Sequence, residues 1–485
     1  MKKIVIVGAG SSGLIAAAMM KNYWGDEVDI SAYYDKSNKN IAVGESTTPI
    51  IRLLLSHLGM STGDLFKQLK TGATMKLGIH FKEWIPDTEY FHGFGQVPVF
   101  DSTNTSAIYS IPEKKFNGGM NYNIPDFNIP DKPFEEYDHA FHIDTQHFSD
   151  LILEHLGDTV TFIDTRIKDV LSDGENIISL TTEDDEIVTA DLFVDCSGFS
   201  NLLFKHLNPK WNDISDALPL DRAIPQQIPH KFMKMPAFTV AEATDNGWIW
   251  KIPIGDRYGT GYVYSSRFVS DDEAREKYDA WLFKNFKVHL DTDRIIRYKP
   301  GYYEEYFIGN CLAVGLSSGF IEPLEATGLQ VIIQQIQEFM TINSTLKNLD
   351  YNRRILNKAH RTLYVDIFDF VCLHYNTNRT DSEFWRYMTA NKTEWVREFD
   401  FKCREEFLDS RTCYREKTFW GLDSFIQVCE GLNMFTNKSI HNFLDSKLDK
   451  ETIILQAKED HQYIEKQKNR TRKVAHKKVL DIIHK

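Results

Sequence analysis

A glycine-rich turn near the N-terminus constrains the fold of this chain more than any other stretch. The β-branched run Lys3–Val7 leads into Gly8-Ala9-Gly10-Ser11-Ser12-Gly13, and Leu14–Met20 then reads as a helix. The first glycine of this turn permits a tight bend, the second lets backbone approach a pyrophosphate, and the third allows close packing of helix on sheet. Two serines lie between the last two glycines, at the helix N-terminus that favours an anion, and we assign Ser12 to the cofactor site. The pattern predicts an α/β module with a dinucleotide site.

The segments that follow favour FAD as the dinucleotide. A second strand, Val28–Tyr34, ends at Asp35, whose carboxylate is placed to bind an adenosine ribose. Nicotinamide and flavin cofactors both use such a module, but the small-residue loop Val43-Gly44-Glu45-Ser46-Thr47-Thr48-Pro49 can run along an isoalloxazine edge. The strand Ala190–Asp195 then ends in the turn Cys196-Ser197-Gly198, and we assign Gly315 to the same site. Gly259-Thr260-Gly261 leads into no helix, so the chain has one dinucleotide site.

A tryptophan pair marks a second landmark, Trp248-Ile249-Trp250-Lys251-Ile252-Pro253. Two indoles at alternate positions of an extended segment point to the same side, and we expect the proline to stop the ladder. Base rates favour a buried edge strand whose tryptophans belong to the core. A rigid wall of a cavity is the alternative.

Composition excludes several classes of protein. A net charge of -13 disfavours a nucleic-acid partner, because phosphate neutralisation needs clustered Lys and Arg. No stretch approaches the roughly 20 apolar residues of a spanning helix, so we expect no membrane partner and a cytoplasmic location. The six cysteines form no CxxC pair, which predicts reduced thiols and no metal site.

The length of 485 residues predicts more than one module. We expect an FAD-binding module with inserted substrate segments over 1–345 and a mostly helical subdomain over 346–485 that completes the substrate site. Helices are predicted over Tyr351–Tyr375, Thr380–Asp400 and Gly421–Met434. The aromatic stretch 90–138 reads as an insertion or lid, or as an irregular surface loop. The basic run Lys466–Lys485 reads as a solvated helix or frayed tail.

Taken together, these motifs resemble the flavin-dependent halogenases of the tryptophan halogenase type. The resemblance rests on the glycine turn, the Trp248–Pro253 motif, Lys76 in Met75–Phe81, and Glu322-Pro323-Leu324-Glu325-Ala326-Thr327-Gly328, and it runs from residue 1 to roughly residue 435. It implies a glutathione-reductase-like or flavin monooxygenase-like fold, and it leaves a phage-encoded source open.

The resemblance also implies a mechanism. Reduced FAD (FADH2) reacts with O2 to a C4a-hydroperoxide, which oxidises chloride, bromide or iodide to hypohalous acid, and that acid passes to Lys76. The indole wall of Trp248 and Trp250, closed by Pro253, would prevent direct oxygen transfer to the substrate. A separate NAD(P)H-dependent flavin reductase is implied, because the chain has no nicotinamide site of its own. The resemblance is compatible with a homo-oligomer as well as with a monomer.

The same resemblance assigns roles at the reacting centre. Lys76, which the sequence alone would call a surface lysine, is the implied acceptor of hypohalous acid. Glu325 is the acid that assists at the ring. The alternative is an acid that complements the dipole of a helix beginning near Gly328. Thr327 and Gly328 match backbone positions for halide. Ala326 departs from the serine usual in tryptophan enzymes.

The implied substrate is a small aromatic molecule. His92 and Phe94 match positions that stack on an indole, and Phe419-Trp420 match the opposite wall. The preceding loop, 411–418, is shorter than in tryptophan halogenases, and the groups that hold the charged end of tryptophan have no clear match. We therefore expect another electron-rich indole, phenol or heteroaromatic. An FAD-dependent aromatic hydroxylase (monooxygenase) is the alternative enzyme, and a noncatalytic FAD protein is the third reading.

Overall fold

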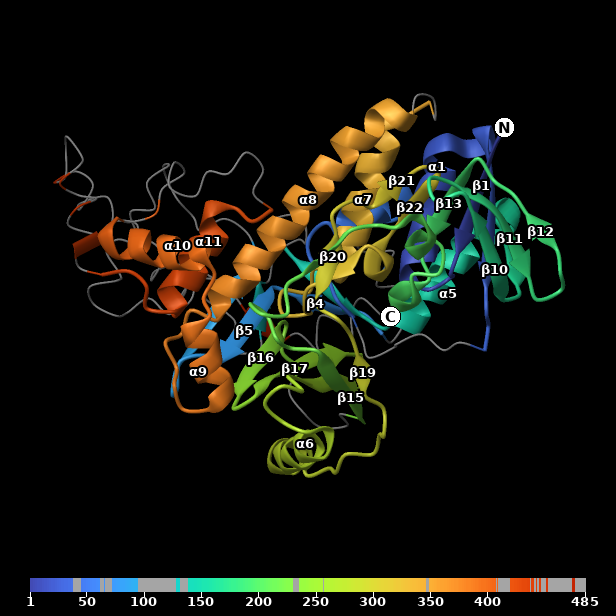
Figure 1. Cartoon of the computed structure of the whole chain (residues 1–485). Helices are drawn as coiled ribbons and strands as arrows, with labels where there is room; N and C mark the ends of the chain where they lie inside the picture. Colours follow the sequence, from blue (N-terminus) through green and yellow to red (C-terminus); the bar gives the residue numbers. More distant parts are fainter. Residues whose placement is uncertain are drawn as a thin grey trace. The chain divides into compact units, whose positions relative to one another are not determined.

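The chain forms two compact units, each assembled from three separated segments. The computed structural model describes residues 1–37, 45–61, 65, 72–94, 128–130, 138–229, 235–255, 257–345, 349–406, 408, 419–436, 438–439, 442, 445, 451 and 473–475 (Figure 1). Unit 1 comprises Met1–Ala73, Phe141–Ser215 and Tyr298–Val365, and unit 2 comprises Thr74–Ala140, Asp216–Arg297 and Asp366–Lys485. The expected division into an FAD-binding module over 1–345 and a mostly helical subdomain over 346–485 stays a prediction.

Unit 1 is built on a six-stranded sheet with the order β21-β22-β13-β1-β2-β9. The strands are β21 (Phe307–Ile308), β22 (Cys311–Ala313), β13 (Leu192–Asp195), β1 (Lys2–Val7), β2 (Val28–Tyr34) and β9 (Thr161–Asp164). Ile4 of β1 is opposite Ile30 on one side and Leu192 on the other, both in parallel ladders. Buried β-branched residues fill β1, as a strand covered on both faces requires. The α/β fold predicted for the N-terminal module is confirmed.

Helices and smaller sheets complete unit 1. The helices are α1 (Ser11–Trp24), α2 (Ile51–His57), α5 (Thr145–Leu156), α7 (Gly328–Ile342) and the first part of α8 (Leu349–His374). The other strands are β3 (Glu45–Ser46), β8 (Ala140–Ile143), β10 (Ile167–Ser172), β11 (Ile177–Thr182), β12 (Ile187–Val188), β14 (Trp211–Asp213), β20 (Gly301–Tyr303) and β23 (Gly319–Phe320).

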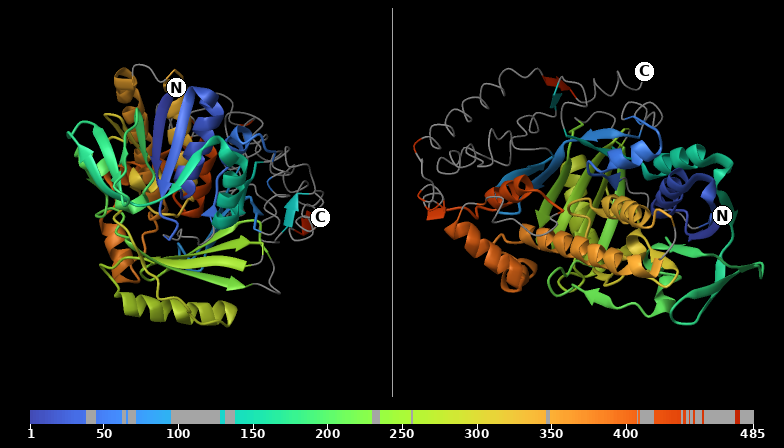
Figure 2. Two further views of the ribbon diagram at one scale, coloured as in Figure 1. Left: turned by 90° about the vertical axis from the view of Figure 1, so that its right-hand side faces the viewer. Right: turned by 90° about the horizontal axis from the view of Figure 1, so that it is seen from above.

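Unit 2 contains a seven-stranded sheet with the order β19-β15-β18-β17-β16-β5-β6. Its strands are β19 (Ile296–Arg297), β15 (Arg222–Pro229), β18 (Arg257–Tyr264), β17 (Gly247–Ile254), β16 (Thr239–Thr244), β5 (Gly78–Lys82) and β6 (Glu89–Gly93). Helix α6 (Asp271–Phe286) lies along one face of this sheet (Figure 2), where Ile249, Tyr262 and Tyr278 share one buried cluster. The short strand β4 (Thr74–Lys76) also belongs to this unit.

The prediction that Pro253 stops the ladder is wrong. Strand β17 lies inside the sheet and pairs with β18 as far as Ile254, with Pro253 opposite Tyr258. The pairing of β17 with β16 ends at Lys251. Pro253 therefore lies beyond that pairing, in the part of β17 that is paired with β18. A proline, which lacks an N–H, is tolerated at such an edge-like position.

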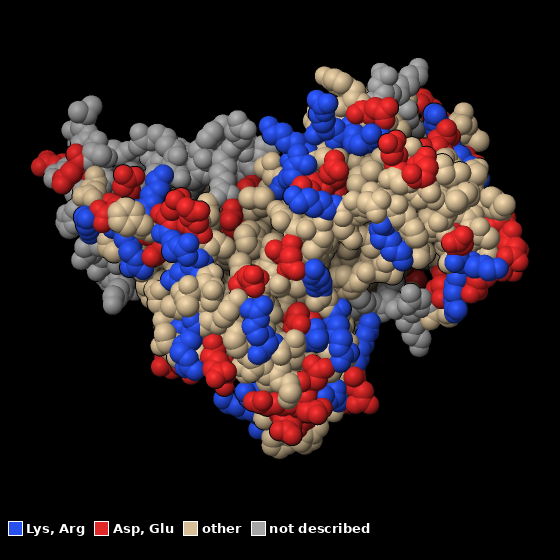
Figure 3. Space-filling view, viewed as in Figure 1, with Lys and Arg blue, Asp and Glu red and all other residues tan. Residues whose placement is uncertain are grey.

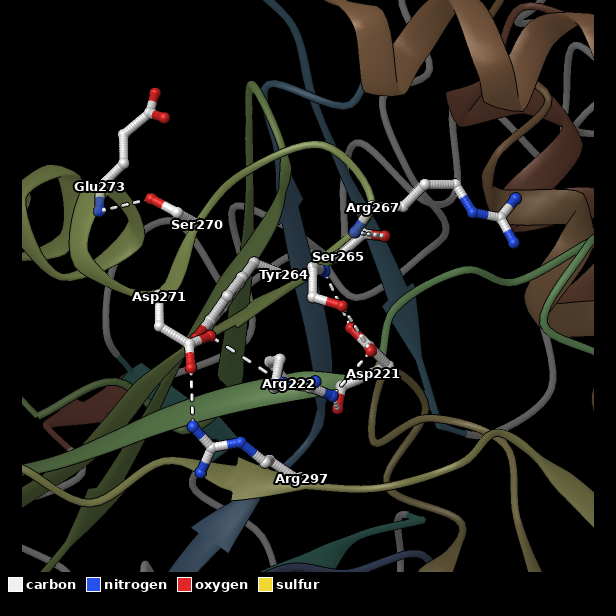
Figure 4. Close-up of polar contacts among 10 residues, drawn as sticks. Asp221, Arg222, Tyr264, Ser265, Arg267, Ser270, Asp271, Glu273 and Arg297 are labelled. Carbon is white, nitrogen blue, oxygen red and sulfur yellow. Dashed lines mark hydrogen bonds and ion pairs between the residues drawn. The ribbon is translucent and has the colours of Figure 1, made fainter.

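Helix α6 is fixed to its sheet by a cluster of polar contacts (Figure 4). The Tyr264 hydroxyl on β18 and the Arg297 guanidinium on β19 donate to the two oxygens of Asp271, each at 2.7 Å. These hydrogen bonds, the one from Tyr264 first, lower the pKa of Asp271. The Ser270 Oγ caps the helix by accepting from the Glu273 N–H.

The C-terminal part is helical, with one correction. Besides α8, the helices are α9 (Glu383–Ala390), α10 (Glu394–Glu405) and α11 (Leu422–Gly431). The single helix predicted over 380–400 is two helices, because Thr393 caps α10 through the Val396 N–H and interrupts the run. In the basic tail, β24 (Lys473–Ala475) pairs with β7 (Asn128–Pro130), so the helix-or-tail prediction is wrong for these residues.

Within the described residues, no helix is long and apolar enough to cross a membrane, and no cluster of metal-ligating side chains occurs. Cys196, Cys311, Cys372, Cys403 and Cys429 are free and buried, and Cys413 lies outside the described residues. On the face drawn in Figure 3, basic and acidic side chains are interspersed. Most of the predicted insertion 90–138 and the loop 411–418 also lie outside the described residues.

Candidate active site

The glycine turn between β1 and α1 leaves no room for a side chain at Gly8 or Gly13. Gly8 has φ +104°, and a Cβ there would lie 2.3 Å from the Cys196 carbonyl oxygen. A Cβ on Gly13 would lie 1.8 Å from the Gly8 carbonyl oxygen. Helix α1 follows Gly10 with no side-chain cap and no acidic residue in its first turn. Its first N–H groups therefore suit the pyrophosphate of a dinucleotide.

Asp35, the residue after β2, has protein partners of its own. One carboxylate oxygen accepts from the Ser37 N–H and hydroxyl at 2.9 and 2.5 Å, and the other accepts from Arg166 Nε at 2.7 Å. These hydrogen bonds, those from Ser37 first, lower the pKa of Asp35. Asp35 is thus held ionised and oriented, and a carboxylate has further lone pairs for a ribose hydroxyl.

The loop predicted to follow a flavin edge is anchored through its second half. Glu45 and Ser46 form β3, which pairs antiparallel with β8. The Thr47 hydroxyl donates to the Phe141 carbonyl at 2.8 Å, and the Phe141 N–H donates back to that hydroxyl at 2.9 Å. Burial raises the pKa of Glu45 to about 7. Gly44 lies outside the described residues.

Asp195, at the end of β13, organises the remaining turns, and sequence reasoning missed it. It is fully buried, and its carboxylate accepts from the Ser197 N–H and hydroxyl, from the N–H groups of Leu203 and Phe204, and from the Ser317 hydroxyl. Five donors at one carboxylate tie the Ser197-Gly198 turn to the turn after Gly315. An acid directly after a buried apolar strand was the available signal.

Gly315 begins a short turn, η7 (Gly315–Ser317), against α1 and α7. Its φ is +64°, and a Cβ there would lie 2.9 Å from Ile332 and 3.3 Å from Ser12. The Gly315 N–H donates to Gln335 Oε1 at 3.0 Å. The structure thus brings together Ser12, Gly315 and, through Asp195, Ser197.

The segment Glu322–Gly328 turns the chain into α7. The Ala326 N–H donates to the Pro323 carbonyl at 3.0 Å, and Ala326 itself is left-handed, with φ +57°. That conformation costs an L-residue roughly 1–2 kcal/mol. Glu325, one residue before it, is 4% exposed.

The N-terminus of α7 follows this turn. Thr327 is the cap residue, its side chain makes no capping hydrogen bond, and the first turn of the helix holds no acid. A Cβ on Gly328 would meet nothing within 4 Å. This open helix end, with no acid in its first turn, suits a small anion.

In unit 2, Lys76 ends β4 and has no exposed surface. Its Nζ lies 5.0 Å from the centroid of the Phe94 ring, in cation–π range. Two residues earlier, the Thr74 hydroxyl donates to the Pro253 carbonyl at 2.6 Å. Lys76, Phe94 and the end of the tryptophan strand therefore meet in one region.

An aromatic series extends from the strand that precedes Phe94. His92 lies 5.5 Å from Phe370, which stacks on Trp420 at 4.1 Å between ring centroids, and Phe419 lies 4.4 Å from Trp420. The Asp366 carboxylate accepts from the Phe419 N–H at 3.2 Å. Sequence reasoning found three of these four rings and missed Phe370, which reads as an ordinary apolar position of α8.

Trp248 and Trp250 project from the face of β17 opposite to Ile249 and α6. They are 2% and 7% exposed, and their ring centroids are 6.3 Å apart. Trp250 is opposite Gly261 on β18, where a Cβ would lie 2.1 Å from its Cη2 atom. The Gly259–Gly261 segment, which is not a dinucleotide turn, thus provides the slot that fixes one indole.

This slot gives a testable expectation. Gly261→Val should lower the free energy of unfolding by about 1–3 kcal/mol, because the new side chain overlaps the indole and a well-packed interior relaxes little. Urea denaturation followed by tryptophan fluorescence measures the effect. Gly421→Ala, where a Cβ meets nothing within 4 Å, is the control. A wild-type midpoint for Gly261→Val would show that the indole is not held there.

Comparison with known proteins identifies the family. Residues 3–447 match the family model described as tryptophan halogenase. The chain belongs to the tryptophan halogenase family. It is similar to the tryptophan 7-halogenase RebH of Lentzea aerocolonigenes, with 32% identity over 438 residues, which cover 80% of this chain and 78% of that protein. The chain is accordingly a flavin-dependent halogenase, an oxidoreductase.

Solved structures agree with this assignment. Xcc4156, a flavin-dependent halogenase from Xanthomonas campestris, superimposes with a TM-score of 0.87 at 25% identity and covers 99% of this chain and 98% of its own. BrvH, a flavin-dependent halogenase from Brevundimonas sp. BAL3, gives 0.84 at 26% identity and covers 100% and 99%. The predicted fold, a flavin module with a helical C-terminal region, is confirmed for this halogenase.

Proposed function

We propose that this halogenase uses FADH2, O2 and halide to halogenate a small electron-rich aromatic molecule other than free tryptophan. The observation that carries the proposal is the complete burial of Lys76 beside Phe94, because full burial is uncommon for a lysine and this lysine lies at the position that the family resemblance assigns to hypohalous acid. The flavin turn, the Trp248–Pro253 strand and the aromatic series support the same reaction.

The residues of unit 1 fit FAD. The Gly8–Gly13 turn and the first N–H groups of α1 would bind the pyrophosphate, and Asp35 would bind the ribose. Residues 44–47, Ser197, Gly198 and Gly315 would line the flavin. When bound, reduced FAD supplies, with O2, the two-electron oxidation of halide to hypohalous acid. Thr327 and Gly328 would hold the halide through N–H donors at the start of α7.

Lys76 would receive the hypohalous acid. Its ammonium can donate a hydrogen bond to the acid, or its neutral amine can form an N-halo amine with release of water. Trp248 and Trp250 would exclude direct oxygen transfer, since rigid indoles leave no open path for it.

The substrate ring would stack on the aromatic residues of unit 2. His92, Phe94, Phe419 and Trp420 are the proposed contacts, and Phe370 fixes His92 and Trp420 by packing on both. Glu325 would stabilise the cationic ring intermediate or accept its proton, as a buried carboxylate can.

One assay tests the proposal. The protein is supplied with FAD, a separate NADH-dependent flavin reductase, O2 and chloride, bromide or iodide in turn, against a panel of indoles, phenols and heteroaromatics. We expect halogenated products by mass spectrometry, only with halide present, and little product from free tryptophan. Hydroxylated products that form regardless of halide would instead identify an aromatic monooxygenase.

A further inference from the structure

Helix α11 packs against the strand that carries His92 and ends just before Phe94. Gln427 Oε1 accepts a hydrogen bond of 2.8 Å from the N–H of Gly93, which lies between those two residues. At Gly431, one turn further along α11, a Cβ would lie 2.3 Å from the Tyr90 ring. One side of α11 therefore lies along the substrate-binding strand β6.

Glu430 lies beside this contact and carries a carboxyl group without a partner. It follows Gln427 by three residues, so the two side chains are neighbours on the helix. Both carboxyl oxygens of Glu430 are buried, and none of the described residues donates a hydrogen bond to either. Burial raises the pKa of Glu430 well above its ordinary value.

A second acid lies on the same side of α11. Asp423 precedes Glu430 by seven residues, which is two helical turns, and burial raises its pKa as well. The helix sequence, LDSFIQVCEG, contains no Lys, Arg or His. The side chains of α11 therefore carry negative charge or none, and the helix itself has no cation that could pair with either acid.

A lone buried carboxyl destabilises a fold, because it loses its hydration and gains no hydrogen bond. Buried polar groups in native proteins are nearly always paired, and exceptions concentrate at functional sites. The missing partner at Glu430 should be a donor that arrives with the substrate. A protonated amine fits, since it donates charge-assisted hydrogen bonds and its positive charge complements the negative charge of both acids.

We propose that Glu430 is a specificity-determining residue that binds a protonated amine on the aromatic substrate, with Asp423 adding a second negative charge. The inference rests on the proposed function and narrows its substrate class to aromatics with a basic side chain and no adjacent carboxylate. Because α11 has no basic residue, a zwitterionic amino acid would gain the amine contact but find no partner there for its carboxylate.

Binding measurements test this without flavin or halide. Isothermal titration calorimetry compares tryptamine, 3-methylindole and tryptophan on the wild type and on Glu430→Gln. We expect tryptamine to bind the wild type at least about tenfold more tightly than 3-methylindole, and Glu430→Gln to remove that preference. Glu398→Gln, at an exposed position of α10, removes the same charge elsewhere and should change nothing.

The outcomes separate this inference from the halogenase proposal. Equal affinities of the wild type for tryptamine and 3-methylindole, an unchanged preference in Glu430→Gln, or no tryptamine binding at millimolar concentration would each overturn the role of Glu430. An intact amine preference in a protein that never halogenates would overturn only the proposed reaction. As a structural check, Glu430→Met should raise the melting temperature, because an unpaired acid in the interior is replaced by an apolar side chain of similar length.

Discussion

Lys76→Met should retain flavin binding and eliminate halogenated product. The methionine fills most of the space of the lysine stem, so the aromatic surroundings of Phe94 keep their packing, but no amine remains to receive hypohalous acid. Loss of a group that acts directly on the reacting species costs roughly 10²–10³-fold or more in rate. Product is measured by mass spectrometry in the reductase-coupled assay, and flavin affinity by fluorescence quenching.

The control for this variant is Lys82→Met in the adjacent strand β5. Its ammonium is partly exposed and pairs with Glu89 at 3.5 Å, so its loss should leave the rate of halogenation within about twofold. Both variants should consume reduced flavin and O2 as the wild type does. Wild-type product formation by Lys76→Met would remove Lys76 from the mechanism.

Gly13→Ala should lower FAD affinity by at least about a hundredfold, since a shift of 1 Å in a binding constellation has effects of that order. The new Cβ would lie 1.8 Å from the Gly8 carbonyl oxygen and 2.9 Å from its carbon. Both are backbone atoms and cannot rotate away, so α1 must move from β1 and carry the pyrophosphate donors with it. Titration of apoprotein with FAD measures the change.

Gly421→Ala again serves as the control, because its Cβ meets no atom within 4 Å. It should bind FAD like the wild type. A Gly13→Ala protein with unchanged FAD affinity and unchanged stability would show that the turn does not hold the pyrophosphate.

The parts that sequence predicted correctly are those set by local chemistry. Strand, glycine turn and helix at residues 2–24 are contiguous, and the steric reasons for Gly8 and Gly13 lie within that span or at the turn after one neighbouring strand. The start of α7 at Gly328 was likewise expected. Such features need only short-range information.

Other features depend on distant partners and could not be predicted in the same way. The surroundings of Lys76 include Pro253, which Thr74 contacts across 179 residues, and nothing near position 76 encodes this burial. Pro253 itself was misjudged because its tolerance depends on where β16 stops pairing. Glu430 reads as an ordinary helix acid, and only its packing shows that it lacks a partner.

The central position of β1 has a consequence for biosynthesis. One of its neighbours, β13, is anchored to it by Lys2 and Asp191, which are 189 residues apart. At 5–20 residues per second, a ribosome needs about 10–40 s to make that partner. During this time the apolar edge of β1 has only β2 to pair with, and unpaired strand edges invite aggregation. A nascent chain of this halogenase should therefore depend on ribosome-associated chaperones, and slower translation should lower its soluble yield.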